Sequence, residues 1–265
     1  MDLFSLSSGA EGAFLILCAA AGACAASFLE TVAHRSVQGR PWWGRARSVC
    51  EACGSVLAPR DLIPLLSALV SRGRCRLCGA PIPKRHLLSE AVLALAWGLL
   101  AWRFGASYAL IPALILSALG LYHSLTDLEC GYIYDLPVYV TLGLGLLLRL
   151  PGGVPALVDG VAGAAAGWGI LALIILASRG GMGWGDALLM LGFGAFLGWK
   201  AALLALYGGF AVGGVWAVTL LLRGKAKRKD PIPLGPFLAL GAVGALLLGN
   251  RVLDWFGFAP SWPWG

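Results

Sequence analysis

Residues 156–178 read ALVDGVAGAAAGWGILALIILAS and decide the class of fold. This run of 23 residues contains a single charged side chain, Asp159. About 20 consecutive, predominantly apolar residues are enough for an α-helix to cross the hydrocarbon core of a bilayer. The run therefore predicts a transmembrane helix, and the rest of the chain must be compatible with a membrane.

The composition of the whole chain agrees with this prediction. Of the 265 residues, 59% are apolar and 12% are charged, about half the ~25% typical of soluble domains. The mean hydropathy is +0.81. These values exclude a disordered chain and a secreted disulfide scaffold, and they argue against a soluble enzyme. The 38 glycines fit close helix packing in lipid. We therefore predict an all-α polytopic membrane protein.

Apolar runs separated by polar breaks predict about eight transmembrane helices. The expected spans are residues 13–33, 87–103, 108–126, 136–150, 156–178, 187–199, 201–222 and 233–249. The chain then divides into a first transmembrane helix (1–33), a polar domain (34–86) and a seven-helix membrane domain (87–265). The start of the chain lacks a basic segment, so we interpret the first span as a retained helix rather than a signal peptide.

The basic residues predict the orientation. With the N-terminus outside, the inner segments 34–86, 127–135, 179–186 and 223–232 carry 16 of the 20 Lys and Arg residues. The outer segments carry the other four, Arg149 among them, and Asp159 also falls on the outer side. Such a bias follows the positive-inside rule. The positive-inside rule therefore accounts for the net charge of +7. We expect the lipid bilayer as partner and no nucleic acid.

Four of the seven cysteines lie in the polar domain as two Cys-x2-Cys pairs. The pairs are Cys50 with Cys53 and Cys75 with Cys78, and a glycine follows each pair. Two such turns supply four thiolates, the ligand set of a structural Zn²⁺ site. Disulfides are the alternative, but the segment is expected in the cytoplasm, a reducing compartment. With four protein ligands the metal would support folding rather than hydrolysis.

Two acidic sites lie at the predicted inner face, at Asp127 and in Gly183-Trp-Gly-Asp186. Ionisable residues at membrane spans are costly, which makes them functional candidates. Two facing carboxylates can share one proton, as in aspartic proteases. The ionised member can activate water while the protonated member polarises a peptide carbonyl. The structural alternative to catalysis is helix capping. Asp186 would cap its own helix, and Asp135 would cap the span that follows it.

In combination, these motifs resemble the type IV prepilin peptidase family, membrane aspartyl proteases with a Gly-x-Gly-Asp motif. The matching segments follow the family's order along the chain. They are SFLETVAHR (27–35), CEACG (50–54), IPLLS (63–67), RGRCRLCGAPI (72–82), RHLLSE (85–90), DLECGYIYD (127–135), GMGWGD (181–186) and PIPLGPFLALG (231–241).

The resemblance implies an endopeptidase that removes the basic leader from prepilins or pseudopilins at the cytoplasmic face of the bacterial inner membrane. It also implies S-adenosylmethionine-dependent methylation of the new N-terminus. By residue matching, Asp127 and Asp186 are the catalytic pair and Asp135 is the noncatalytic aspartate of the motif. Gly183 and Gly185 are expected to allow close backbone approach beside Asp186.

Glu30 and Glu90 are matched to the methyltransferase step. Departures such as Glu30, where the family usually has Asn, leave methylation less supported than cleavage. Two alternatives stay open at this stage. One is a peptidase without methyltransferase activity, and the other is a noncatalytic membrane scaffold.

Overall fold

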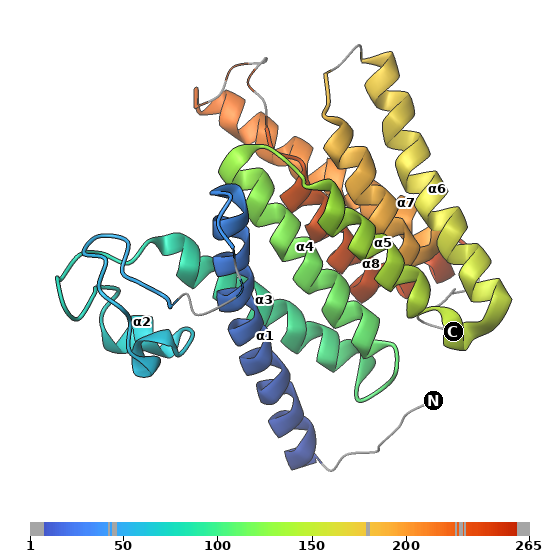
Figure 1. Ribbon diagram of the computed structural model, residues 1–265. Coiled ribbons are helices and arrows are strands. Elements are labelled where there is room, and N and C mark those ends of the chain that lie inside the picture. Colours follow the sequence, from blue (N-terminus) through green and yellow to red (C-terminus); the bar gives the residue numbers. More distant parts are fainter. Residues whose placement is uncertain are drawn as a thin grey trace.

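The computed structural model describes residues 8–258, apart from 42, 44–46, 179–180, 226, 228–229 and 231. Pro231, the first residue of the last motif, and part of the basic stretch 223–229 therefore lie outside the described residues. The described chain is nearly all helical (Figure 1), which confirms the predicted class. The elements are α1 (Ser8–Val37), η1 (Pro59–Leu62), α2 (Leu66–Val70), α3 (Lys84–Phe104), α4 (Leu110–Cys130), α5 (Asp135–Leu147), η2 (Leu150–Gly152), α6 (Gly153–Ala177), α7 (Trp184–Leu222) and α8 (Gly235–Trp255).

Fewer helices meet the criteria for a membrane span than the sequence predicted. Six helical stretches of the described residues are long and apolar enough to cross a bilayer, against about eight expected. The difference has two sources. At ~1.5 Å per residue, the 13 residues of α5 are too short to cross alone, and α5 joins α6 in one stretch, Asp135–Ala177. The spans predicted at 187–199 and 201–222 form one helix of 39 residues, α7.

A sharp break inside α7 explains the two spans predicted there. Gly198 has non-helical backbone angles, φ 77° and ψ 168°. Positive φ is accessible to glycine at little cost because it has no Cβ. In Figure 1 both ends of α7 lie at the same end of the bundle, so the chain reverses at this glycine. The predicted boundary at residue 200 is displaced from the break by two residues.

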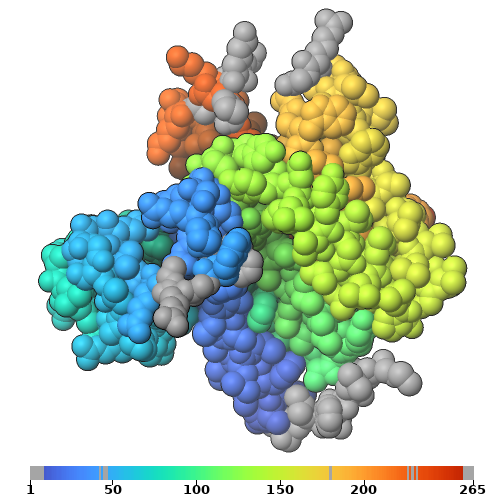
Figure 2. Space-filling model, viewed as in Figure 1, coloured from blue at the N-terminus to red at the C-terminus, as the bar shows by residue number. Residues whose placement is uncertain are grey.

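Figure 1 also groups the segments that the charge pattern assigned to the inner side. The C-terminal ends of α1, α4 and α6 and the N-terminal ends of α5, α7 and α8 lie at one end of the bundle. Residues 47–82, between α1 and α3, form a lobe beside α1 (Figure 2). The helical bundle therefore presents both acidic motifs at the end where the polar lobe emerges.

Glycines bring α6 and α7 into direct backbone contact. A Cβ built on Gly163 would lie 2.3 Å from the carbonyl oxygen of Gly194 and 2.5 Å from the carbonyl carbon of Gly198. No side chain fits in this space. In lipid, where burial of apolar surface gives helices little reason to associate, such close contact supplies the packing energy. The high glycine content of the chain is therefore a packing requirement at this interface.

A buried ion pair holds the reversal of α7. The fully buried Arg149 donates to Oδ2 of Asp159 at 2.8 Å and to the carbonyl oxygen of Phe196 at 3.0 Å. Asp159 also accepts a hydrogen bond from the amide of Trp199 at 3.4 Å. The charge pattern had placed Arg149 and Asp159 as separate residues of the outer side. The two residues neutralise each other between helices, as buried charges must.

The α6–α7 contact predicts a stability difference between two glycines of α6. Gly163→Ala should destabilise the protein by about 1–3 kcal/mol, because the added methyl group overpacks the interface. Gly169→Ala is the matched control, since no described atom lies within 4 Å of a Cβ built there. The midpoint of thermal unfolding in detergent measures the effect. Equal midpoints for the two variants would contradict the packing assignment.

Candidate active site and metal centre

Asp127 lies in the last turn of α4. The amide of Gly131 donates to the carbonyl oxygen of Asp127 at 2.8 Å, and Gly131 has φ 66°. A glycine in the left-handed conformation is a common C-terminal helix cap. The local sequence Asp127-Leu-Glu-Cys-Gly131 therefore ends the helix one turn after the aspartate. The side chain of Asp127 nevertheless stays buried, with the residue 7% exposed.

The carboxylate of Asp127 is held by the start of another helix. The amide of Gly235, the first residue of α8, donates to Oδ2 of Asp127 at 2.8 Å. The first amides of a helix have no partner within the helix, and they suit an anion. A Cβ on Gly235 would lie 2.8 Å from the same oxygen. In the sequence this segment is marked only by its resemblance to the family, because 108 residues separate the two groups.

Asp186 lies in the first turn of α7. Gly183 is the N-cap residue, with an extended backbone (φ −76°, ψ 143°), and its carbonyl oxygen accepts from the amide of Asp186 at 3.3 Å. Asp186 therefore follows the cap instead of forming it. The alternative that Asp186 is the N-cap of its own helix is therefore wrong, because Gly183 holds that position.

The fold brings the two acidic motifs together. The carboxylates of Asp127 and Asp186 lie close enough for their charges to interact. Ile133, buried in the loop after α4, lies against α7, and a Cβ on Gly185 would approach the Cβ of Ile133 to 3.2 Å. Gly185 therefore allows the close approach that was expected beside Asp186. The nearest described atoms to a Cβ on Gly183 are at 3.9 Å and beyond, an ordinary contact.

Asp135 differs from these two aspartates in its surroundings. It is exposed and is the first residue of α5, whose N-cap is Tyr134. The capping role that the sequence suggested for Asp135 therefore falls to the preceding residue. Among the hydrogen bonds of this loop, the hydroxyl of Tyr134 donates to the carbonyl oxygen of Ser36 at 3.4 Å. The loop thus connects α4 to the end of α1.

The four cysteines of the polar lobe lie at two turns with the same hydrogen bonds. The amide of Gly54 donates to the carbonyl oxygen of Cys50 at 2.8 Å, and the amide of Gly79 donates to that of Cys75 at 2.9 Å. Both glycines have positive φ, 69° and 74°. Each turn lies within a short antiparallel pairing, Val49 with Val56 and Arg74 with Pro81. The predicted pair of matching metal-binding turns is present.

The thiol geometry fits a tetrahedral metal site. The four Sγ atoms, those of Cys50, Cys53, Cys75 and Cys78, all lie within 4.8 Å of one another. The Sγ atoms of Cys50 and Cys78 are 3.9 Å apart. Tetrahedral Zn²⁺ with bonds of about 2.3 Å places sulfur atoms about 3.8 Å apart. Hydrogen bonds from the hydroxyl and the amide of Ser55 lower the pKa of the Cys53 thiol to about 6, whereas burial and the neighbouring thiols raise the pKa of the Cys78 thiol to about 11. A cation is therefore needed before all four thiols can ionise together.

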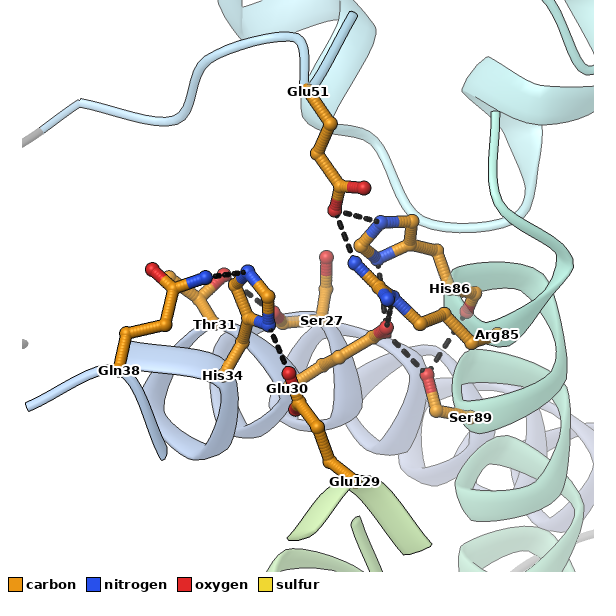
Figure 3. Close-up of polar contacts among 10 residues, drawn as sticks. All are labelled: Ser27, Glu30, Thr31, His34, Gln38, Glu51, Arg85, His86, Ser89 and Glu129. Atoms are coloured by element: carbon orange, nitrogen blue, oxygen red, sulfur yellow. Dashed lines mark hydrogen bonds and ion pairs between the residues drawn. The ribbon is translucent and has the colours of Figure 1, made fainter. Parts of the chain in front are cut away.

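Glu30 lies in a polar cluster between α1 and α3 (Figure 3). Its carboxylate is buried, accepts from the hydroxyl of Ser89 at 2.7 Å and lies 2.9 Å from Nδ1 of His86. Arg85 lies next to it, with Nε 3.6 Å from Glu30, and also contacts Glu51. The cluster balances two acidic side chains against nearby donors, as a buried charge requires.

Glu90 has a local structural contact. It is buried in α3 and accepts a hydrogen bond from the amide of Leu65 at 2.8 Å. Leu65 precedes α2 and has φ 62°, a strained conformation for a residue with a side chain. The carboxylate of Glu90 therefore stabilises a strained turn of the lobe. Of the two acidic residues matched to the methyltransferase step, Glu30 joins α1 to α3, and Glu90 joins α3 to the lobe.

Comparisons with known proteins match two consecutive parts of the chain. Residues 20–104 match a family described as Bacterial Peptidase A24 N-terminal domain, and residues 114–218 match the Type IV leader peptidase family. No solved structure matches.

Three curated relatives carry the same name, Prepilin leader peptidase/N-methyltransferase. The relative from Bacillus subtilis (strain 168) is 31% identical over 79% of this chain and 85% of its own length. The relative from Aeromonas hydrophila is 36% identical over 79% of this chain and 74% of its own. The relative from Pseudomonas aeruginosa is 32% identical over 91% of this chain and 92% of its own.

The thiol cluster predicts loss of metal when one ligand is removed. Cys50→Ser should lower the zinc content of the purified protein from one equivalent to a small fraction, because a structural site needs all four ligands. Cys24→Ser, in the membrane part of α1, is the control. Inductively coupled plasma mass spectrometry gives the metal content. One retained equivalent of zinc in Cys50→Ser would contradict the four-thiolate assignment.

Proposed function

Because the chain belongs to the type IV leader peptidase family, we propose that it is a membrane aspartyl endopeptidase that cleaves the basic leader from prepilins or pseudopilins. The family is one of proteases, so the chain is an enzyme. The names of its relatives support a prepilin as substrate. Six apolar helical stretches make it a multi-pass membrane protein.

One observation carries the proposal. Asp127 and Asp186, 59 positions apart in the sequence, interact electrostatically at the end of the bundle where α4 ends and α7 begins. A pair of neighbouring carboxylates beside a membrane can hold one proton between them, the arrangement that hydrolyses peptide bonds in aspartic proteases. The remaining support comes from the family to which the chain belongs.

The surroundings of the two carboxylates suggest how they divide the work. An amide hydrogen bond favours an ionised carboxylate, and Asp127 receives one from Gly235. In the proposed reaction Asp127 takes a proton from water, and the resulting hydroxide attacks the peptide carbonyl carbon. The proton held by Asp186 moves to the carbonyl oxygen. When the C–N bond breaks, the proton taken up by Asp127 passes to the departing amine nitrogen. One hydroxyl group of the tetrahedral intermediate returns its proton to Asp186 as the C=O bond re-forms, so both carboxyl groups regain their starting states.

We place this site at the cytoplasmic face of the bacterial inner membrane. The support is the positive-inside rule, since 16 of the 20 basic residues belong to the segments predicted on that side. The ends of the helices that border these segments also lie together in Figure 1. The basic leader of a prepilin would then lie in the cytoplasm, and its apolar segment would lie in the bilayer.

We extend the proposal to methylation of the new N-terminus with S-adenosylmethionine as donor, on the strength of the relatives' names. The carboxylates of Glu30 and Glu90 do not single out a site for this donor, because both are engaged by protein groups. No step of the proposed peptide cleavage uses the donor. A peptidase without methylation and a noncatalytic scaffold are the alternatives that the following experiment separates.

The proposed dyad predicts that neither carboxylate can be replaced. Asp127→Asn and Asp186→Asn should each lower leader cleavage by at least about 10³-fold, because removing one member of a unit removes its joint action. The assay incubates the purified protein in detergent with a prepilin, with and without S-adenosylmethionine. Intact-mass analysis then reports leader loss and methyl addition separately.

Asp254→Asn, an exposed aspartate at the end of α8, is the control and should cleave normally. Full cleavage by either dyad variant would rule out the assignment. Cleaved product without an added methyl group in the presence of the donor would favour the peptidase-only alternative. A wild-type protein that leaves the prepilin intact would favour the scaffold.

The amide contact to Asp127 predicts a second difference, between two glycines of α8. Gly235→Ala should lower the turnover number by about 10²-fold, because displacing a reacting group by about 1 Å has effects of that size. Gly244→Ala is the matched control, since no described atom lies within 4 Å of a Cβ there. The prepilin assay measures both. Normal turnover by Gly235→Ala would show that Asp127 needs no close approach of α8.

A further inference from the structure

The last turns of α1 make polar contacts with two different parts of the molecule. Glu30 and His34 are four residues apart in α1, so they lie one helical turn from each other. Figure 3 shows the side chain of Glu30 reaching α3 and that of His34 reaching Glu129, which belongs to α4. The end of α1 is thus fastened to two elements by charged groups, and each contact leads to a candidate functional site.

The contact at Glu30 leads to the metal-binding lobe. His86 lies between two carboxylates, with Nδ1 2.9 Å from Glu30 and Nε2 3.4 Å from Glu51. Arg85 also contacts both of these glutamates. Glu51 directly follows Cys50, one of the four thiols. The first cysteine turn is therefore connected to α1 through contacts between side chains, from Glu51 through Arg85 and His86 to Glu30.

The contact at His34 leads to the candidate active site. Nδ1 of His34 lies 2.5 Å from Oε1 of Glu129, and Gln38 contacts the other ring nitrogen at 2.7 Å. Glu129 stands two residues after Asp127, in the last turn of the same helix. The hydroxyl of Tyr134, in the loop after α4, bonds to Ser36. The end of α1 is therefore tied to the segment that carries the proposed catalytic carboxylate.

From this chain of contacts we propose that His34, Glu129 and Glu51 are positioning residues for Asp127, through which the metal-binding lobe orients the active site. The inference rests on the proposed function and deepens it. None of the three residues is assigned to the reacting atoms. They fix the end of α1 against α4 and thereby the place of the Asp127 carboxylate. A shift of about 1 Å at a reacting group is enough to change a rate by about 10²-fold.

Exposure separates this role from an ordinary contribution to stability. The side chains of His34 and Glu129 are 32% and 30% exposed. Partly exposed ion pairs contribute about 1 kcal/mol or less to folding. Removing the contact should therefore leave the folded protein intact. A positioning role then shows itself in the turnover number, with little change in thermal stability, metal content or the Michaelis constant.

A double-mutant cycle on purified, zinc-loaded protein tests the inference. His34→Ala and Glu129→Ala should each lower the turnover number for a prepilin by about tenfold, and the double variant by about tenfold as well, because both remove one contact. Glu51→Gln should lower it in the same direction. All of these variants should keep one equivalent of zinc, a Michaelis constant within about twofold of wild type and an unchanged melting temperature.

Two controls match these variants. Glu11→Gln removes an exposed carboxylate at the opposite end of α1. Asp61→Asn removes an ion pair with Arg76 that lies within the lobe. Both should cleave as wild type. Single variants with normal turnover, a double variant with about a hundredfold loss, or a change confined to the Michaelis constant would each overturn the positioning role.

The same assay distinguishes this failure from failure of the proposed function. If Asp127→Asn is inactive while His34→Ala is normal, the dyad stands and the positioning role falls. If Asp127→Asn cleaves as wild type, the proposed function itself falls.

Discussion

A bilayer leaves the backbone no partner except itself, and this constraint organises the whole molecule. Helices satisfy their own amide and carbonyl groups along their length, so unpaired backbone donors exist only at helix ends. The candidate active site is built at these ends. Asp127 lies where α4 stops, Asp186 lies where α7 starts, and the first amide of α8, from Gly235, reaches Asp127. The helix ends thus supply the backbone donor that holds Asp127.

The same constraint determines how much of the fold could be predicted from the sequence. Apolar runs located the helical segments because hydropathy is a local property. The number of apolar helical stretches in the described chain is six, below the predicted eight, because α5 and α6 count as one stretch and the two halves of α7 form one helix that reverses at Gly198. The two cysteine turns were predicted well, since each is a Cys-x2-Cys-Gly segment that folds on itself. Contacts between distant segments left no such signal. The charge pattern predicts Arg149 and Asp159 on the outer side, but it carries no sign that Arg149 is fully buried against Asp159.

In the candidate site, too, the sequence reveals features of a single segment but not contacts between distant segments. Two aspartates at the inner ends of spans could be picked out from the sequence, because charge beside lipid is costly. The amide of Gly235 could not be found in this way, since its contact with Asp127 joins residues 108 positions apart. Glu30 and Glu90 were matched to methyl transfer by resemblance alone. Their contacts with Ser89 and the amide of Leu65 give each a structural role that no motif encodes.

The cost of burying Asp127 bears on the choice between an enzyme and a scaffold. The residue is 7% exposed, and Gly235 supplies one amide to a group that can accept several hydrogen bonds. Placing a second carboxylate, Asp186, near enough to interact adds repulsion whenever both are ionised. A scaffold gains nothing from this arrangement, because apolar residues of similar size would pack the helix ends without the desolvation cost. The proposed peptidase reaction would use such a pair, because it needs one ionised and one protonated carboxyl group.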